Sequence, residues 1–126
     1  MNPDEPILTE DDHEIWARWR RECLAWSRLR QHRRAVHQAR KLCLEMTQVC
    51  ERPYIAWSGG KDSTVLVHLI RVELGLDVPV MSLVTDIEPP GTRAYLEARA
   101  EEWGIEVEIV EPEVSFMAWL LEHAAD

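Results

Sequence analysis

The residue types best suited to chemistry lie together in one short segment, Ser58-Gly59-Gly60-Lys61-Asp62-Ser63. Gly59 and Gly60 have no Cβ, so the backbone can turn sharply there and let an anion approach its N–H groups. Lys61 adds a full positive charge, and the hydroxyls of Ser58, Ser63 and the following Thr64 add donors. Asp62 could cap a helix or hold a Mg²⁺ ion that bridges phosphates. The segment predicts a phosphate-binding loop, and the simpler alternative is a glycine turn without a ligand.

The flanking sequence indicates how this loop is positioned. The apolar run 54–57 is typical of a short buried strand, and the spacing of apolar residues over 63–74 predicts a helix. A loop that opens a helix gains the unpaired N–H groups and the positive dipole end of its first turn. A Walker A loop is excluded because it would need a glycine where Ile55 stands, and a dinucleotide-type GxGxxG is absent.

Two further strand–helix pairs follow the loop. Strands are predicted over 78–85 and 105–110, and helices over 92–103, with Thr92 as N-cap, and 115–124; Gly75 and Gly104 end helices. Right-handed crossovers then give an α/β fold with a small parallel sheet in the order 3-2-1 and flanking helices. The third strand alternates apolar and acidic residues, which suits an edge. Asp86 follows the second strand, at the carboxyl edge where such sheets bind ligands.

A helical arm is predicted to precede the sheet. Thr9 and Asp12 form a capping-box pattern, and no Gly or Pro interrupts the chain from there to about residue 49. The pattern indicates one long helix or two, with a break near Gln31-His32. The predicted organisation is a disordered N-terminus over 1–8, a helical arm over 9–52 and a truncated α/β domain over 53–126. Trp16, Trp19 and Trp26 are expected to pack on the domain or in a dimer interface.

Charge is distributed unevenly along the chain, whose formal net charge is −9. Residues 17–41 contain eight arginines and one lysine against the single acid Glu22, whereas the chain after Arg99 contains acids and no Lys or Arg. The arm is interpreted as a solvated helix face that pairs with the acidic domain of its own chain or of another. The alternative is contact with a nucleic acid.

Composition also restricts the cellular setting. No apolar run approaches ~20 residues, so no membrane span is expected. The acidic N-terminus lacks the apolar segment of a secretory signal. Cys23, Cys43 and Cys50 form no zinc-site spacing and are typical of reduced thiols in a cytoplasmic protein.

The loop resembles the SGGxDS signature of the pyrophosphate-binding loop (PP-loop), and its lysine form resembles the phosphoadenosine phosphosulfate (PAPS) reductase family in particular. These belong to the PP-loop ATP pyrophosphatase, or adenine nucleotide alpha hydrolase-like, superfamily. Residues 84–92 resemble the family's second ligand loop: Asp86 keeps the acid at the strand end and Thr92 the helix cap, with an altered segment between them. The resemblance implies a Rossmann-like domain that binds ATP or a PAPS-type nucleotide. The implied nucleotide-binding residues are Ser58, Gly59, Gly60, Lys61, Asp62, Ser63 and Asp86.

The resemblance also implies roles for individual residues. Lys61 and Asp62 would act in catalysis, and Asp62 and Asp86 would hold Mg²⁺. Family members continue with further strands, phosphate-gripping basic residues and, in the reductases, a C-terminal catalytic cysteine, whereas no cysteine follows Cys50 here. The chain is therefore identified as a truncated member, for which thiol-dependent PAPS reduction alone is not expected. The absent fourth strand would leave the first strand unpaired, so a homodimer, a partner protein or the helical arm is expected to cover that edge.

Three functions stay open on this basis. The first is an adenine-nucleotide enzyme, an ATP pyrophosphatase that adenylates an acceptor or a transferase of that type. The second is a non-catalytic nucleotide-binding subunit or modulator that needs a partner chain. The third is a nucleic-acid-modifying PP-loop subunit that uses the basic arm.

Overall fold

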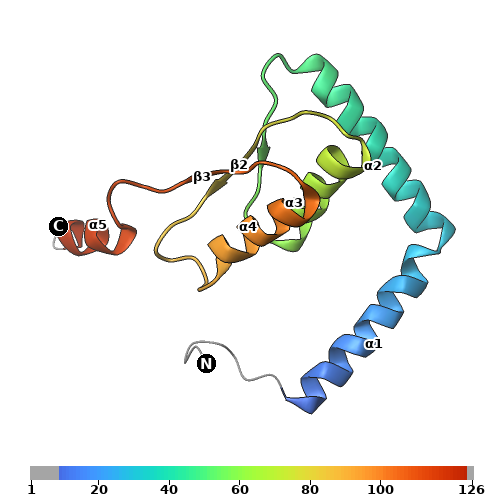
Figure 1. Ribbon diagram of the computed structural model, residues 1–126, viewed down its shortest axis with the longest axis horizontal. Helices are drawn as coiled ribbons and strands as arrows, with labels where there is room; N and C mark the ends of the chain where they lie inside the picture. The colour runs from blue at the N-terminus through green and yellow to red at the C-terminus, as the bar shows by residue number, and fades with distance from the viewer. Residues whose placement is uncertain (1–8, 125–126) are drawn as a thin grey trace. The chain divides into compact units, whose positions relative to one another are not determined.

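The structure, a computed structural model, describes residues 9–124 and divides into two compact units, Met1–Leu44 and Glu45–Asp126. The predicted disordered segment 1–8 lies outside the described residues. The first unit holds helix α1 (Glu10–Ser27) and most of helix α2 (Arg30–Val49), and the second holds the end of α2 and the sheet (Figure 1). None of the described helices is long and apolar enough to cross a membrane.

The start of α1 confirms the predicted capping box. The Asp12 amide donates to the Thr9 hydroxyl oxygen over 3.2 Å, and the Thr9 amide donates to the Asp12 carboxylate over 2.9 Å. The arm consists of two helices rather than one. The break falls at Arg28 and Leu29, earlier than the predicted Gln31-His32, because the Arg28 amide bonds back to the carbonyl of Ala25 in a tight final turn.

A three-stranded parallel sheet forms the centre of the second unit. Its strands are β1 (Ile55–Ala56), β2 (Val80–Leu83) and β3 (Glu108–Val110), in the order β1-β2-β3. This confirms the predicted fold class and strand order, with β3 at one edge, although each strand is shorter than predicted. Ile55 pairs with Val80 and Ser82 with Ile109, so all three strands run in the same direction with their carboxyl ends at one edge.

The connections between the strands are helical. Helix α3 (Lys61–Val67) continues directly into a π-helix, η1 (His68–Glu73), where a single regular helix over 63–74 was predicted. Helix α4 (Thr92–Trp103) links β2 to β3, and helix α5 (Phe116–His123) follows β3. Gly75 and Gly104 both have φ of 62° and lie just after η1 and α4, as predicted from their positions.

The predicted role of Thr92 as the N-cap of α4 is wrong. The capping position belongs to Gly91, which has φ of 85° and no side chain to offer, and Thr92 is the first helical residue. The Thr92 hydroxyl instead donates to the Pro89 carbonyl over 2.8 Å. The left-handed turn at Gly91 thus moves the helix start by one residue, and Thr92 stabilises the preceding loop.

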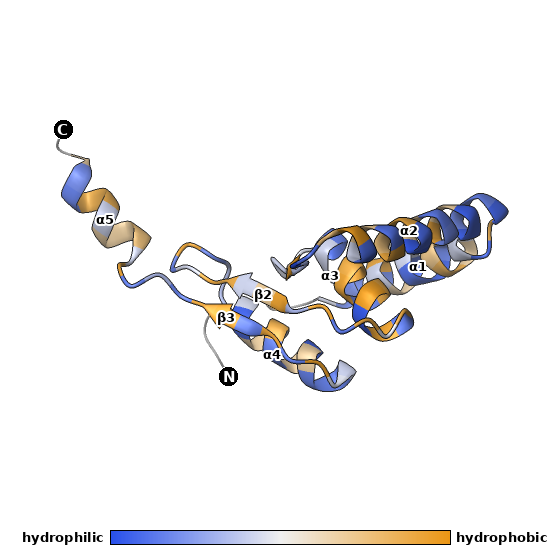
Figure 2. Ribbon diagram, turned by 90° about the horizontal axis from the view of Figure 1, so that it is seen from above, coloured by the Kyte–Doolittle hydropathy of each residue, from blue (hydrophilic) through white to orange (hydrophobic). Residues whose placement is uncertain are grey.

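The core of this unit lies between the sheet and the helices that cross it. Trp57, Val67 and Leu96 are its largest fully buried side chains. The Trp57 ring stacks on Trp103 with centroids 5.8 Å apart, and His68 meets the edge of the same ring at 5.2 Å. The end of β1, the start of η1 and the end of α4 therefore share one core, and Figure 2 shows hydrophobic residues along β2, β3 and α3.

Candidate functional site

The loop after β1 is tied to the helix that follows it. Trp57, only 1% exposed, anchors the end of the strand in the core. Its indole N–H donates to the Thr64 hydroxyl over 2.9 Å, and the Thr64 amide donates to the Gly60 carbonyl over 3.0 Å. The core thus holds both ends of the glycine turn, so the turn keeps its shape without a ligand.

Two serine hydroxyls close the loop from within. The Ser58 and Ser63 hydroxyl oxygens lie 3.0 Å apart, and the Ser58 amide also donates to the Ser63 oxygen over 3.3 Å. Ser63 donates its hydroxyl hydrogen to the Gly60 carbonyl at 3.2 Å, so the hydrogen shared with Ser58 comes from Ser58. The Gly60 amide in turn donates to the Ser58 oxygen over 3.3 Å. The predicted loop residues therefore form one hydrogen-bonded unit.

Gly59 gives the turn its shape. Its φ of 79° lies in the left-handed region, which glycine adopts without the steric cost that a Cβ would bring. A Cβ added at Gly59 would lie 3.6 Å from Leu96, 3.7 Å from Thr92 and 3.8 Å from Tyr95, all on α4. The loop therefore packs directly on the first turns of α4, and the space around Gly59 matters less than its backbone conformation.

The start of α3 offers donors that the rest of the described chain does not use. The amides of Lys61, Asp62 and Ser63 have no acceptor within residues 9–124, as is usual for the first turn of a helix. Gly60 occupies the N-cap position without a side-chain cap. These N–H groups can therefore bind an anion, with the helix dipole adding to the attraction.

Lys61 and Asp62 contact each other at the surface. The Lys61 ammonium lies 2.6 Å from the Asp62 carboxylate, and the two side chains are 88% and 89% exposed. A solvent-exposed pair of this kind contributes little to stability and separates easily when another charged group competes. Lys61 is therefore available to a phosphate held at the adjacent glycines.

A cavity of about 570 Å³ lies where two loops meet at the carboxyl edge of the sheet. One wall is the β1–α3 loop, with Ser58, Gly59 and Gly60. The other wall consists of the β2–α4 loop and the start of α4, with Glu88, Pro89, Pro90, Gly91, Thr92 and Tyr95. This volume is in the range of small-molecule binding sites.

The second wall was predicted in part, because the resemblance placed residues 84–92 in a second ligand loop. Glu88 received no binding role of its own, and Tyr95, which lies on α4 beyond that loop, was missed. The signal that could have found them is topological. Parallel neighbouring strands place the loops after their carboxyl ends side by side, so the loop after β2 must border the loop after β1.

Asp86 lies at the carboxyl end of β2 but is engaged by α5. Its carboxylate accepts hydrogen bonds from the Ser115 hydroxyl at 2.7 Å, the Phe116 amide at 2.9 Å and the Met117 amide at 3.2 Å. The Ser115 hydroxyl bond, followed by the amides of Met117 and Phe116, holds the pKa of the Asp86 carboxyl below its usual value. Asp86 does not line the cavity, and here it stabilises the start of α5.

The described residues do not by themselves form a metal site. No group of three or more His, Cys, Asp or Glu side chains gathers within residues 9–124. Both Asp86 oxygens already accept hydrogen bonds, and Asp62 is paired with Lys61. A Mg²⁺ ion would therefore depend mainly on phosphate oxygens and water, with Asp62 as the carboxylate that belongs to the loop itself.

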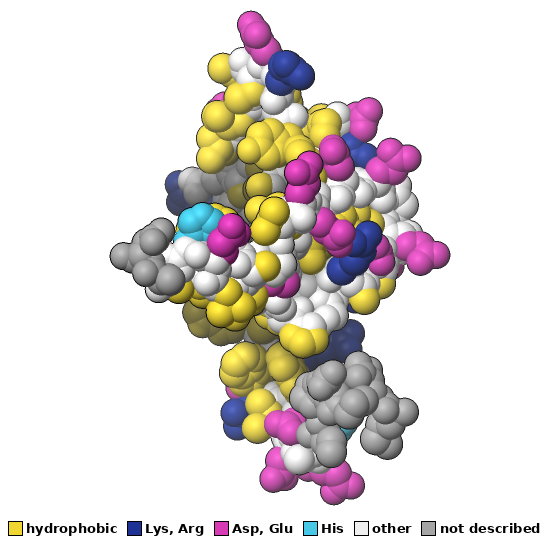
Figure 3. All heavy atoms as spheres, turned by 90° about the vertical axis from the view of Figure 1, so that its left-hand side faces the viewer, with side chains coloured by type: hydrophobic (Ala, Val, Ile, Leu, Met, Phe, Trp, Pro, Cys, Tyr) yellow, Lys and Arg dark blue, Asp and Glu magenta, His cyan; other side chains and the backbone are white. Residues whose placement is uncertain are grey.

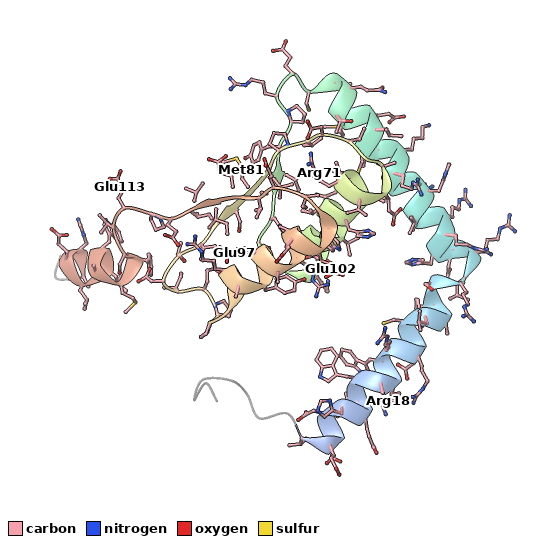
Figure 4. All side chains as sticks on the ribbon, in the orientation of Figure 1. Arg18, Arg71, Met81, Glu97, Glu102 and Glu113 are labelled. Carbon is pink, nitrogen blue, oxygen red and sulfur yellow. The ribbon has the colours of Figure 1, made fainter. Side chains whose placement is uncertain are left out.

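Arg93, in the first turn of α4, is already paired with carboxylates. Arg93 donates a hydrogen bond over 3.0 Å to Glu97, which is labelled on α4 in Figure 4. Arg93 also pairs with Glu111, which follows β3. The hydrogen bond that Arg93 donates to Glu97, together with the charges of Glu111 and Glu97, raises the pKa of Arg93. Carboxylates are also spread over the face of the molecule shown in Figure 3. Lys61 is therefore the cation best placed to attract an anion to the loop.

Comparison with known proteins agrees with this arrangement. The family model for the phosphoadenosine phosphosulfate reductase domain matches residues 52–124, which is more than half of the chain and includes both loops of the cavity. No curated protein matches the chain. The chain therefore belongs to the phosphoadenosine phosphosulfate reductase domain family, which indicates a PAPS-reductase-like function related to an adenine nucleotide.

Proposed function

We propose that this chain binds ATP or an adenylyl sulfonucleotide, with the phosphates on the Ser58–Ser63 loop and the rest of the nucleotide in the adjoining cavity. The observation that carries the proposal is that this loop and the β2–α4 loop line the same cavity. Family membership supports the nucleotide class. The choice between ATP and a sulfonucleotide depends on which phosphate groups the loop accepts.

The phosphate end of the proposed site uses the backbone and Lys61. A phosphate beside Gly59 and Gly60 would accept hydrogen bonds from the first amides of α3 and displace Asp62 from the Lys61 ammonium, which lies 2.6 Å away. Ser63 already bonds to Ser58, so it positions the loop and adds a hydroxyl at the same edge. The result is an anion site formed largely from groups that are in place before binding.

The other wall of the cavity offers apolar surface beside its one carboxylate, Glu88. Pro89 and Pro90 form part of the wall, and the Tyr95 ring, 39% exposed, offers an aromatic surface. An adenine ring can stack on such a surface while its phosphates point toward Gly59. This orientation places the phosphates beside the loop amides and away from the wall that carries Glu88.

A catalytic version of the proposal is adenylation of an acceptor. An acceptor oxygen would form a bond to the α-phosphorus of ATP while the bond to the bridging oxygen breaks and pyrophosphate leaves. Lys61 and the loop amides would stabilise the charge that develops on the pyrophosphate. Glu88 and Tyr95 are the titratable side chains among the cavity-lining residues, and both are exposed. Their exposure favours a non-catalytic nucleotide-binding module as the second candidate function. Release of pyrophosphate from ATP distinguishes the two.

The test is isothermal titration of ATP, AMP and PAPS, each with and without Mg²⁺, against the wild type and two lysine variants. Lys61 and Lys41 are the only lysines in the chain, so Lys41→Ala is a matched control for Lys61→Ala. We expect Lys61→Ala to weaken binding about ten- to a hundredfold, as expected for one charge-assisted contact, and Lys41→Ala to leave it unchanged. Equal binding by both variants, or no binding of any nucleotide, would contradict the proposal.

A further inference from the structure

Within the described residues, the hydrogen bonds that join α5 to the rest of its unit all end at one side chain. The Asp86 carboxylate accepts them from the Ser115 hydroxyl at 2.7 Å, the Phe116 amide at 2.9 Å and the Met117 amide at 3.2 Å. Helix α5 has no buried residue, and Figures 1 and 2 show it beyond the carboxyl end of β3, away from α3 and α4. These three bonds therefore attach α5 to the loop that begins after β2.

That loop is the one that lines the cavity, and Asp86 lies at its start. Just before it, the Val84 amide donates to the Val110 carbonyl over 3.0 Å, so the chain up to that residue belongs to the sheet. The second half of the loop is held locally, because the amide and the hydroxyl of Thr92 both donate to the Pro89 carbonyl, over 3.2 Å and 2.8 Å. The attachment of the first half to another part of the unit is therefore made by Asp86.

We propose that α5 controls the second wall of the nucleotide site: Ser115 and the first amides of α5 hold Asp86, and Asp86 keeps the β2–α4 loop where it lines the cavity. This role rests on the proposed function, since it concerns the cavity that would hold the nucleotide. Ser115 is a positioning residue, because it lies outside the cavity and acts through Asp86. A helix outside the site thus sets the geometry of one of its walls.

The coupling between α5 and the site is reciprocal. If the docked α5 raises the affinity for a nucleotide, a bound nucleotide favours the docked α5 by the same factor. Because the contact is exposed to solvent, we expect a factor of about three to ten. The unit should stay folded when α5 is released, since Glu111, between β3 and α5, still pairs with Arg93 on α4.

Replacement of Asp86 distinguishes this role from the effect of charge. The loss of a negative charge near an anionic ligand should tighten binding slightly, whereas the loss of the loop attachment should weaken it. We expect Asp86→Ala to weaken the binding of ATP or PAPS about three- to tenfold in isothermal titration without Mg²⁺. Omitting the ion removes any contribution of Asp86 as a metal ligand.

Variants of Ser115 test the same contact from the α5 side. Ser115→Ala removes the hydroxyl and should weaken nucleotide binding about three- to tenfold, whereas Ser115→Thr keeps the hydroxyl and should bind as the wild type does. The double variant Asp86→Ala with Ser115→Ala should bind no more weakly than Asp86→Ala alone, because both changes break one contact. Thr9→Ala is the matched control, since it removes an N-cap hydroxyl from α1, a helix that does not hold the loop.

Amide hydrogen exchange measured by NMR gives a readout that needs no nucleotide. The Glu88 amide donates to the Thr85 carbonyl over 3.3 Å within the loop, and it should exchange faster in Ser115→Ala than in the wild type. In the wild type, saturating ATP or PAPS should slow the exchange of the Phe116 and Met117 amides about threefold or more, although neither residue lines the cavity.

The role of α5 and the proposed function can fail separately. A wild type that binds no nucleotide would contradict the proposed function, and the Glu88 exchange rate in Ser115→Ala would still decide whether α5 holds the loop. An unchanged exchange rate there would overturn the role of α5. Nucleotide binding by Ser115→Ala as tight as that of the wild type, tighter binding by Asp86→Ala, or additive losses in the double variant would overturn it as well.

Discussion

The indole N–H of Trp57 donates a hydrogen bond to the Thr64 hydroxyl at 2.9 Å, across the seven-residue step that contains the candidate phosphate loop. Trp57 ends β1 and is buried, and Thr64 lies in the first turns of α3. The bond therefore joins the strand and the helix beneath the loop, and the loop geometry depends on it.

The first prediction concerns this bond. Thr64→Val keeps the side-chain volume but removes the acceptor, so the buried indole N–H loses its partner. We expect a loss of about 1–3 kcal/mol in the free energy of unfolding, measured by urea denaturation. Thr64→Ser keeps the acceptor oxygen and should cost clearly less. Equal losses in the two variants would show that packing, and not the hydrogen bond, sets the effect.

The second prediction separates loop geometry from stability. Gly59→Ala and Gly75→Ala each place a Cβ at a positive φ, 79° and 62°, and should each destabilise the fold by about 1–2 kcal/mol. Of these two glycines, Gly59 lines the cavity and Gly75 does not, so Gly59→Ala alone of the pair should weaken nucleotide binding, by about tenfold. Binding is measured by isothermal titration at a temperature where both variants are folded. A similar loss of affinity for Gly75→Ala would place the effect in global stability.

The third prediction concerns the acid in the cavity wall. Glu88 lines the cavity together with the candidate phosphate loop, and its negative charge would oppose an anionic ligand. Glu88→Gln should therefore tighten Mg²⁺-free nucleotide binding about two- to fivefold, the effect of one solvent-exposed charge. The gain should shrink at high salt. Glu102→Gln, on α4 but outside the cavity, is the control, and weaker binding by Glu88→Gln would instead mean that the carboxylate contacts the ligand directly.

The fourth prediction is a pH dependence at α5. The hydrogen bonds from Ser115, Met117 and Phe116 hold the pKa of Asp86 below its ordinary value of 3.8. A lowered pKa in the folded state means that ionised Asp86 stabilises the fold fully above pH 3.8, and that this contribution is lost as the pH falls through the folded-state value. The backbone amide signals of Phe116 and Met117 in NMR spectra should therefore titrate with a midpoint below 3.8.

Asp86→Asn is the control for that measurement, because it removes the titrating group while keeping one acceptor oxygen. The acid titration of both amides should then disappear. A wild-type midpoint at or above 3.8 would contradict the hydrogen-bonded arrangement and would return Asp86 to the role of a free carboxylate near the ligand loops.

Several elements of the fold depend on local chemistry and could therefore be predicted directly from the sequence. The capping box at Thr9 and Asp12 depends on residues three apart, and the helix ends at Gly75 and Gly104 depend on single glycines that tolerate a positive φ. The order of the parallel sheet followed from short apolar strands alternating with helices and from the handedness of their crossovers. Where the local signal was ambiguous, as at Gly91 and Thr92, the predicted N-cap of the helix was wrong by one residue.

The sequence by itself determined the glycine turn that forms the candidate phosphate loop and the topology that places it at the carboxyl edge of the sheet, because both depend on residue type and spacing. Only the tertiary structure decided what surrounds that loop. Glu88 and Tyr95 reach the cavity because β1 and β2 are neighbours, and Asp86 turns to α5 because Ser115, far along the chain, offers it hydrogen bonds. Contacts between distant segments arise from the packing of the whole domain, and no local pattern encodes them.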